Sequence, residues 1–339
     1  MKKIVLALTA VLAFISCRPT ITTPPGPKEN TITGYISSDM TWYSDTVYTM
    51  VGKVVVDSGV TLTIQPGTLI KAEDGQGSLS TALIIARNGM INAQGTADSP
   101  IVFTSIYDID GNLDETDQGM WGGIVILGNA PISADAVPAN IEGIPVNEGY
   151  GLYGGADQTD NSGILKYVSI RHAGTLLGGG NELNGLTLGG VGRGTTIEHI
   201  EVVGNLDDGI EFFGGCVDAS NLLVWAQGDD AFDVDQGWFG TVTNYVGIEG
   251  LDSDHALELD GGEGNLNPAF TLEKGTFISS DNLVEFHFRD FALGFVSYDY
   301  TVTPANIVAD SATSVMIDAT VGADLTVFDW TMASERGAL

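Results

Sequence analysis

A short phrase of acidic and apolar residues returns four times between positions 205 and 289, and few folds can accommodate such a repeat. The phrase reads DDGIEF from Asp207, DDAFDV from Asp229, SDHALEL from Ser253 and SDNLVEF from Ser280. Its Asp recurs at steps of 22, 24 and 27 residues, the length of one supersecondary unit and not of a helical heptad. Each phrase sets an acidic residue between two apolar ones, as in a half-buried strand. The repeat therefore predicts a solenoid of strands.

The same strand pattern extends through most of the chain. Short alternating runs such as VTLTI from Val60 and IVFT from Ile101 end at Gly, Asn or Pro, and the chain contains 45 glycines. Helical periodicity is absent from these runs. We predict an all-β protein, a right-handed single-stranded parallel β-helix over residues 31–300 with capped ends, in which residues 301–339 form the C-terminal cap. The Gly-rich stretch 134–161 is expected to leave the coil as an excursion that either has a function or covers an edge.

The N-terminus has the form of an export signal. Lys2 and Lys3 precede a short apolar run, and residues 1–16 end at a small residue before Cys17. This stretch resembles a bacterial lipoprotein signal, which implies that Cys17 is lipidated and becomes the first residue of the mature chain. Residues 17–30, rich in Pro and Thr, would form an extended tether. We therefore expect an outer-membrane lipoprotein at the cell surface, with the periplasmic face as the alternative.

The charge of the chain limits its partners. The sequence has 13 basic and 44 acidic residues, a net charge of −31. Such a charge disfavours nucleic acid and anionic lipid as direct partners and favours cations, neutral glycans or a basic protein partner, such as another outer-membrane protein. If Cys17 carries a lipid, Cys216 is the only other cysteine, so no disulfide can form within the chain.

The four phrases should stack into an acidic ladder, because neighbouring coils of a parallel β-helix lie about 4.8 Å apart. Carboxylates at that spacing repel one another by roughly 1 kcal/mol in water and about 3 to 4 kcal/mol at an effective dielectric constant near 20. Bound calcium, raised pKa values or solvation could offset this repulsion. We predict a corner column of Asp208, Asp230, Asp254 and Asp281, and a binding face made of Glu211, Phe213, Asp233, Asp235, Glu258, Asp260, Glu285 and His287.

A second acidic stretch lies between positions 108 and 117. Its alternating oxygen-bearing side chains resemble a calcium loop, although the stretch lacks the Glu at position twelve that an EF-hand needs. We favour a solvated acidic loop, with a calcium loop as the alternative. If the loop binds metal, the expected ligands are Asp108, Asp110, Asn112 and Asp114.

Three phrases together resemble a family of uncharacterised secreted or lipid-anchored proteins common in the Bacteroidetes. They are WGGIVILG from Trp121, NGLTLGGVG from Asn184 and DDGIEFFGG from Asp207, and the likeness covers about residues 60–330. Members of that family are generally taken as right-handed parallel β-helices. The resemblance supports the predicted fold and the envelope location, but it carries no agreed activity.

A local likeness points to an enzyme instead. The stretches NLDDG from Asn205, GDD from Gly228 and DH from Asp254 resemble, in order and spacing, the Asn-Thr-Asp-Gly, Asp-Asp and Gly-His-Gly motifs of polygalacturonase-type glycoside hydrolases. Leu206 replaces the Thr, no Gly flanks the His, and the Arg-x-Lys of that family has no counterpart. The resemblance implies paired carboxylates for glycoside hydrolysis, with the catalytic set Asp208, Asp229, Asp230 and His255.

These observations favour a non-catalytic surface protein that binds glycan or calcium through its acidic face. A polygalacturonase-like glycoside hydrolase is the alternative function. A structural spacer or adhesin is a third, and it differs from the first in binding no soluble ligand.

Overall fold

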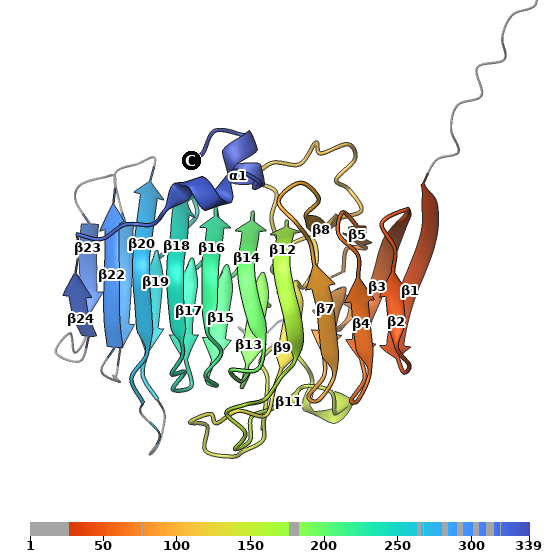
Figure 1. The fold of residues 1–339 in the computed structure, drawn as a ribbon, viewed down its shortest axis with the longest axis horizontal. Coiled ribbons are helices and arrows are strands. Elements are labelled where there is room, and N and C mark those ends of the chain that lie inside the picture. The colour runs from red at the N-terminus through yellow and green to blue at the C-terminus, as the bar shows by residue number, and fades with distance from the viewer. Residues whose placement is uncertain are drawn as a thin grey trace, which may run out of the picture.

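Successive passes of the repeat pair as neighbouring parallel strands, so the chain winds as a parallel β-helix (Figure 1). This confirms the predicted all-β class. The computed structural model describes residues 27–75, 77–175, 183–262, 266, 268–279, 284–289, 294–300, 305–309, 315–318 and 320–339. The signal segment, Cys17 and Asp281 lie outside the described residues, so the lipid anchor stays a prediction. The first strand begins at Lys28, three residues before the predicted start of the helix.

Three sheets, which we call A, B and C, run along the helix and enclose its core. In Figure 1 the coils follow one another from β1 at the right to β24 at the left. Sheet A alone contains β2 (Met40–Trp42), β4 (Thr61–Ile64), β7 (Met90–Gln94) and β24 (Val315–Asp318). Sheet B alone contains β5 (Leu69–Ala72) and β8 (Ile101–Ser105). Sheet C contains β6 (Ala82–Ile85), β9 (Ile124–Leu127), β13 (Leu186–Gly189), β15 (Ile210–Phe213), β17 (Phe232–Asp235), β19 (Leu257–Asp260), β21 (Val284–Arg289) and β23 (Ala305–Ala309).

Longer strands bend and take part in two sheets. β1 (Lys28–Ile36) and β3 (Thr46–Val56) serve sheets B and C. Sheets A and B share β12 (Gly163–Arg171), β14 (Thr196–Val203), β16 (Ala219–Trp225), β18 (Thr241–Glu249), β20 (Thr271–Ser279) and β22 (Gly294–Tyr300). From β12 to β20 the bend is made by one left-handed residue per strand. These residues have φ from 50° to 65° and are Tyr167, His199, Asn221, Asn244 and Lys274.

The core consists of like residues stacked along the axis of the helix. In sheet C two inward rows run from β6 to β21, and every member is buried. Such rows explain why the sequence alternates, since only the inward positions must be apolar. One row is Leu83, Ile124, Leu186, Ile210, Phe232, Leu257 and Phe286, and the other is Ile85, Ile126, Leu188, Phe212, Val234, Leu259 and Phe288.

The predicted excursion leaves sheet C after β9 and folds back over its outer face. It contains a small antiparallel pair, β10 (Ala139–Asn140) and β11 (Leu152–Tyr153), and the short 3₁₀ turn η2 (Val146–Glu148). Ile132, Ile141, Ile144 and Tyr153 pack against outward apolar residues of sheet C, including Val125. The excursion therefore covers the apolar part of that face. A further 3₁₀ turn, η1 (Gly77–Leu79), lies between β5 and β6.

The C-terminal segment differs in place from the predicted end cap. Coils continue through β23 and β24, and residues 320–339 then return along the outer side of earlier coils. This return segment, which we call the strap, contains η4 (Leu325–Phe328) and α1 (Met332–Glu335). It lies across β14, β16 and β18 in Figure 1. Glu201, buried in β14, holds it by accepting a hydrogen bond from the Ala333 backbone N–H at 3.0 Å.

Candidate functional site

An acidic cluster lies on the outer face of sheet C where the cover of the excursion ends. We use this name for Asp207, Asp208, Glu211, Asp229, Asp230 and Asp233. The outward position at the middle of each strand changes along the helix from apolar, under the excursion, to acidic beyond it. In register this position holds Ile84, Val125, Thr187, Glu211, Asp233, Glu258 and His287.

The corners before β13, β15, β17 and β19 carry a second column of polar side chains, and the first three of these side chains bond to the next coil. Asp208 Oδ1 accepts a hydrogen bond from the Asp230 backbone N–H at 3.0 Å. Asp230 Oδ1 in turn accepts from the His255 N–H at 2.9 Å and lies 2.8 Å from His255 Nδ1. Asn184, one coil before Asp208, donates its Nδ2 to Glu211. The corner carboxylates therefore link successive coils.

Two histidines border the cluster on the C-terminal side. The rings of His255 and His287 lie 5.1 Å apart between centroids. His287 Nδ1 is 3.3 Å from Glu258 Oε1, so both rings face a carboxylate. The two side chains are partly exposed, which leaves this edge of the cluster open to solvent.

The cluster brings carboxylate oxygens close enough to share one cation. In the described residues, two groups of metal-competent side chains have ligand atoms within 4.8 Å of one another. One is Asp207, Asp208 and Asp229, and the other is Asp208, Glu211 and Asp233. Ca²⁺ binds oxygens at about 2.3 to 2.6 Å, so two ligands of one ion lie at most about 5 Å apart. Asp208 belongs to both groups and is the centre of the site.

Burial makes the cluster costly to ionise. It raises the pKa of Asp208 and of Glu211 well above the usual range, and the charges of Asp230 and Asp208, respectively, add to the effect. The pKa of Asp230 is raised to about 8, mainly by burial and next by the charge of Asp229. The pKa of Asp233 also rises, first through burial and then through Glu211, with which it shares a hydrogen bond. Two carboxyls can share such a bond only if one of them holds a proton.

Two oxygens in the cluster have no hydrogen-bond partner among the described residues. They are Asp230 Oδ2 and Asp233 Oδ1, both shielded from solvent. Asp230 as a whole is 0% exposed. An unpaired buried carboxylate oxygen is unfavourable unless a proton or a cation satisfies it. The donor set, all hard oxygen atoms, suits Ca²⁺ better than a soft metal.

The structure brings together the four residues that the polygalacturonase likeness singled out. Asp208, Asp229 and Asp230 belong to the cluster, and His255 is hydrogen-bonded to Asp230. The corner column itself differs from the prediction. His255, and not Asp254, stands over Asp230, because Phe232 pairs with Leu257 and the third phrase has one extra residue. Asp254 lies beside Asp229 instead, where its backbone N–H donates to the Asp229 carbonyl.

At the fourth coil of the predicted binding face, the strand register differs by two residues from the one that the repeat suggests. His287, and not Glu285, is in register with Glu258, while Glu285 pairs with Asn306. A shift of two residues keeps the same side chains inward, so the alternation alone could not reveal it. Asp235 follows Phe213 in register, and Asp260 is paired with the backbone of Arg289. Glu211 and Phe213 are also buried, and the ring of Phe213 lies 6.2 Å from that of Tyr153 in the excursion.

The acidic loop from Asp108 to Asp114 does not converge on one point. Asp108 is buried and accepts a hydrogen bond from Thr104 Oγ1 at 2.9 Å, while Asp110 and Asn112 are exposed. Asp114 Oδ1 accepts from the Thr116 hydroxyl and backbone N–H. These four side chains form no close group of metal-competent residues in the described part of the chain.

Three residues of the site were not predicted from the sequence. Asp207 joins the cluster, Asn184 binds Glu211, and Glu142 of the excursion adds negative charge near Asp208. The phrase Asn184-Gly185-Leu186 stands in register with Asp208-Gly209-Ile210. This parallel could have identified Asn184 as the preceding corner. Glu142 carries no such signal, because the excursion lies outside the repeat.

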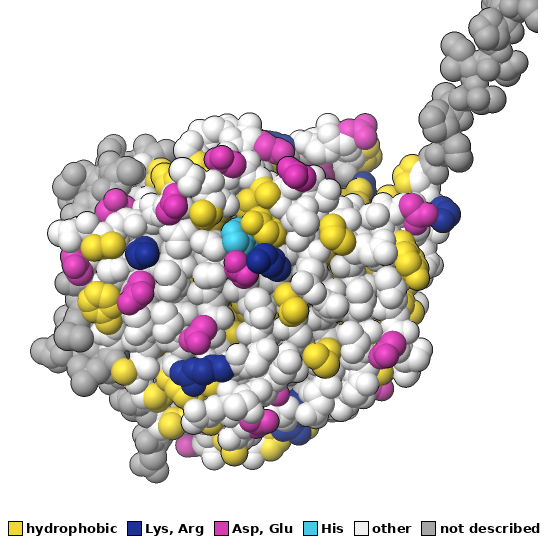
Figure 2. Space-filling model, in the orientation of Figure 1, with side chains coloured by type: hydrophobic (Ala, Val, Ile, Leu, Met, Phe, Trp, Pro, Cys, Tyr) yellow, Lys and Arg dark blue, Asp and Glu magenta, His cyan; other side chains and the backbone are white. Residues whose placement is uncertain are grey.

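On the face drawn in Figure 2, the acidic side chains of the described residues are scattered, and some of them lie beside a basic side chain. No helix in the described part of the chain is long and apolar enough to cross a membrane.

Comparison with known proteins gives one match. Residues 34–287 match a family model described as a pectate-lyase like beta helix domain. A search of curated proteins and a search of solved structures each found no match. The matched range includes every residue of the acidic cluster and both histidines beside it.

Proposed function

This chain belongs to the family of pectate-lyase-like β-helix domains, and from that premise we propose that it binds an acidic polysaccharide without cleaving it, through Ca²⁺ held by the acidic cluster. The observation that carries this proposal is the convergence of Asp208, Glu211 and Asp233, because Asp233 Oδ1 is buried and has no hydrogen-bond partner among the described residues. These residues fit a hard divalent cation in number, charge and spacing. Asp207 and Asp229 add two further carboxylates beside the same centre.

A cation at this position would change the charge that a ligand meets. Without it, a uronate chain would approach a surface of like charge, which is unfavourable. Ca²⁺ binds six to eight oxygen ligands. If each carboxylate contributes one oxygen, either group supplies only three of them. The remaining positions could take water or the carboxylate and hydroxyl oxygens of a sugar. The protein would then bind the polysaccharide by sharing a cation with it.

Glycoside hydrolysis remains the second candidate, supported by the hydrogen bond between Asp230 and His255. Burial argues against it, because a catalytic acid must reach the scissile bond and Asp208 and Asp230 are shielded from solvent. Asp208 is also already bound to the backbone of the next coil. Glycosidase carboxyls flank the sugar at about 5 to 9.5 Å, whereas oxygens of Asp207, Asp208 and Asp229 lie within 4.8 Å of one another. The spacing suits a shared ion better than an intervening sugar.

Retention on immobilised polygalacturonate tests both candidates. We expect the protein to be retained in Ca²⁺ and released by EDTA, and we expect no reducing ends or unsaturated products to appear. Asp208→Asn should reduce retention at least tenfold, because it removes the carboxylate common to both groups. Asp254→Asn is the matched control, since that side chain is 57% exposed and lies outside both groups.

Two results would contradict the proposal. Retention that is equal in EDTA and in Ca²⁺ would exclude the cation. Release of reducing ends by the parent protein, lost in Asp230→Asn, would establish the hydrolase instead.

A further inference from the structure

A polar cavity lies on the first coils of the helix, far along the chain from the acidic cluster. Its volume is ≈ 360 Å³, at the lower end of the range for small-molecule sites. Three turns of the helix and the excursion enclose it. The end of β1 contributes Tyr35, the turn after β3 contributes Asp57, the turn after β6 contributes Arg87, and the excursion contributes Glu148 and Tyr150.

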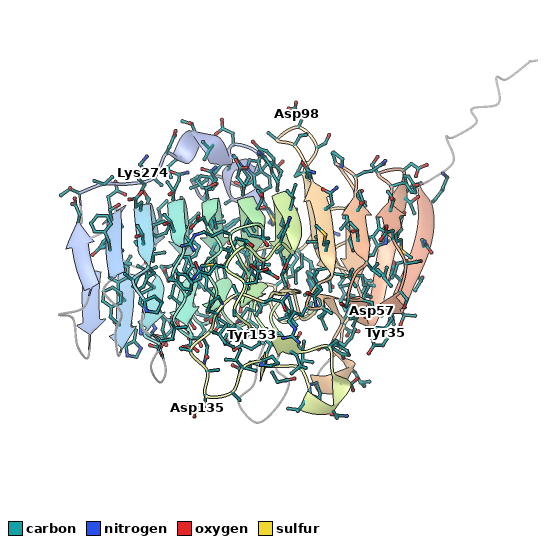
Figure 3. All side chains as sticks on the ribbon, turned by 60° about the horizontal axis from the view of Figure 1, so that its bottom comes forward. Tyr35, Asp57, Asp98, Asp135, Tyr153 and Lys274 are labelled. Atoms are coloured by element: carbon teal, nitrogen blue, oxygen red, sulfur yellow. The ribbon has the colours of Figure 1, made fainter. Side chains whose placement is uncertain are left out.

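Two tyrosines give the cavity an aromatic wall. The rings of Tyr35 and Tyr150 meet edge to face, with centroids 6.0 Å apart and an interplanar angle of 77°. Tyr35 is 57% exposed although it is a large aromatic residue on a β-strand. Figure 3 shows Tyr35 beside Asp57 on the same side of the molecule as Tyr153 of the excursion. Tyrosine offers an apolar ring face together with a hydroxyl at low cost in side-chain entropy.

The polar groups around these rings are held in place before any ligand arrives. The Arg87 guanidinium donates to the Gly154 carbonyl at 3.0 Å, which fixes it against the excursion. Asp57 Oδ1 accepts from the Ser58 N–H at 2.9 Å. The two turns are tied together by the hydrogen bond from the Gly59 N–H to the Asn88 carbonyl at 2.9 Å. Such preorganisation lowers the entropic cost of binding.

The charges select the class of ligand. The cavity is lined by two carboxylates, Asp57 and Glu148, and by one guanidinium, Arg87. This excess of negative charge disfavours an acidic ligand, while carboxylate and guanidinium side by side can bond neighbouring hydroxyl groups as acceptor and donor. Burial and the nearby Glu148 raise the pKa of Tyr150 to about 12, so its hydroxyl keeps its proton as a donor.

We propose that this cavity is a binding site for a neutral saccharide of one to three sugar rings, with the exposed ring of Tyr35 against the apolar face of the sugar and with Tyr150, Asp57 and Arg87 bonded to its hydroxyls. The site goes beyond the proposed function, because it lies on β1, on the turns after β3 and β6 and on the excursion, and it uses none of the residues of the acidic cluster. Its ligand differs in charge, and its binding needs no cation.

Titration with cellotriose, maltotriose, mannotriose and trigalacturonate in EDTA tests this proposal, with saturation-transfer NMR and calorimetry as readouts. We expect at least one neutral trisaccharide to bind in EDTA, and Tyr35→Ala to lower its affinity at least tenfold. Tyr43→Ala is the matched control, since Tyr43 is 52% exposed on a neighbouring turn but does not line this cavity. Both tyrosines are largely exposed, so melting curves should show that each variant folds.

Any of three outcomes would overturn the proposal. No neutral trisaccharide binds at millimolar concentration, or Tyr35→Ala and Tyr43→Ala bind equally well, or trigalacturonate binds in EDTA more tightly than the neutral sugars. Because the titration is done in EDTA, its result is independent of whether the acidic cluster holds Ca²⁺.

Discussion

In EDTA, raising the pH from 6.5 to 8.0 is expected to lower the free energy of unfolding by at least about 2 kcal/mol, or roughly 4 °C in melting temperature. The cause is the acidic cluster. The pKa of Asp230 is raised to about 8, and those of Asp208 and Asp233 are raised as well. A carboxyl whose pKa is higher in the folded state binds protons more tightly there. Its contribution to stability is full below the unfolded pKa near 4 and is lost as the pH rises through the folded pKa.

The pH window is chosen so that other groups contribute little. Burial lowers the pKa of His172 and of His199, so these histidines reduce stability only as the pH falls through about 6.5. Burial lowers the pKa of Lys53 to about 8, so this lysine is half deprotonated at the upper limit, and it offsets only a small part of the loss of stability. Between these limits the net uptake of protons on folding comes from the carboxyls, at about 1.4 kcal/mol per proton and pH unit.

Thermal unfolding followed by circular dichroism provides the measurement. The double variant Glu211→Gln, Asp233→Asn should show a smaller loss between pH 6.5 and 8.0, because two of the raised carboxyls are gone. Asp254→Asn removes only a minor cause of the raised pKa of Asp230, so it should change this loss much less than the double variant does. Equal melting temperatures of the parent at both pH values would contradict the buried, protonated state of the cluster.

Phe328→Ala is expected to cost about 3 to 5 kcal/mol, the usual range for a large side chain removed from a core. Phe328 is fully buried where the strap crosses the helix, in one apolar cluster with Val203, Leu223 and Val246 from three successive coils. In a solenoid each coil otherwise contacts mainly its neighbours. A strap that spans several coils therefore joins them into one cooperative unit, and its loss should also broaden the transition.

Denaturant unfolding gives the midpoint and the slope for this comparison. Val321→Ala removes an apolar side chain from the same segment at a position that is 39% exposed, and its effect should stay within about 0.5 kcal/mol. A cost below 1 kcal/mol for Phe328→Ala would mean that the strap is only loosely attached.

The fold could be predicted because its rule is local. Alternation of apolar and polar residues determines which side chains point inward, and Ile210, Phe212, Phe232 and Val234 all occupy the inward rows expected of them. The register between neighbouring strands is less well determined by this alternation. The run Val284-Glu285-Phe286-His287-Phe288 places apolar residues inward in two registers that differ by two residues. Alternation alone therefore does not determine whether Glu285 or His287 is the neighbour of Glu258.

The state of the acidic residues could not be predicted, because segments distant in the chain decide it. Glu211 was expected to face solvent, but the excursion that carries Tyr153 and Ile141 shields the end of its strand. Asp230 loses its solvent through the packing of the corner itself. The strap likewise follows no repeat, and its apolar residues Phe328 and Met332 fit an end cap as well as a lateral contact. In each case tertiary contacts outweigh the local pattern.

Calorimetric titration of the purified protein with CaCl₂ at pH 7 tests the central claim most directly. We predict a saturable site whose binding releases protons, because Ca²⁺ displaces the protons that the buried carboxyls hold. The heat should therefore depend on the ionisation enthalpy of the buffer. Asp208→Asn should weaken this site at least tenfold, and Asp254→Asn should leave it unchanged. A titration without a saturable site, or one identical in the parent and in Asp208→Asn, would contradict a cation in the acidic cluster.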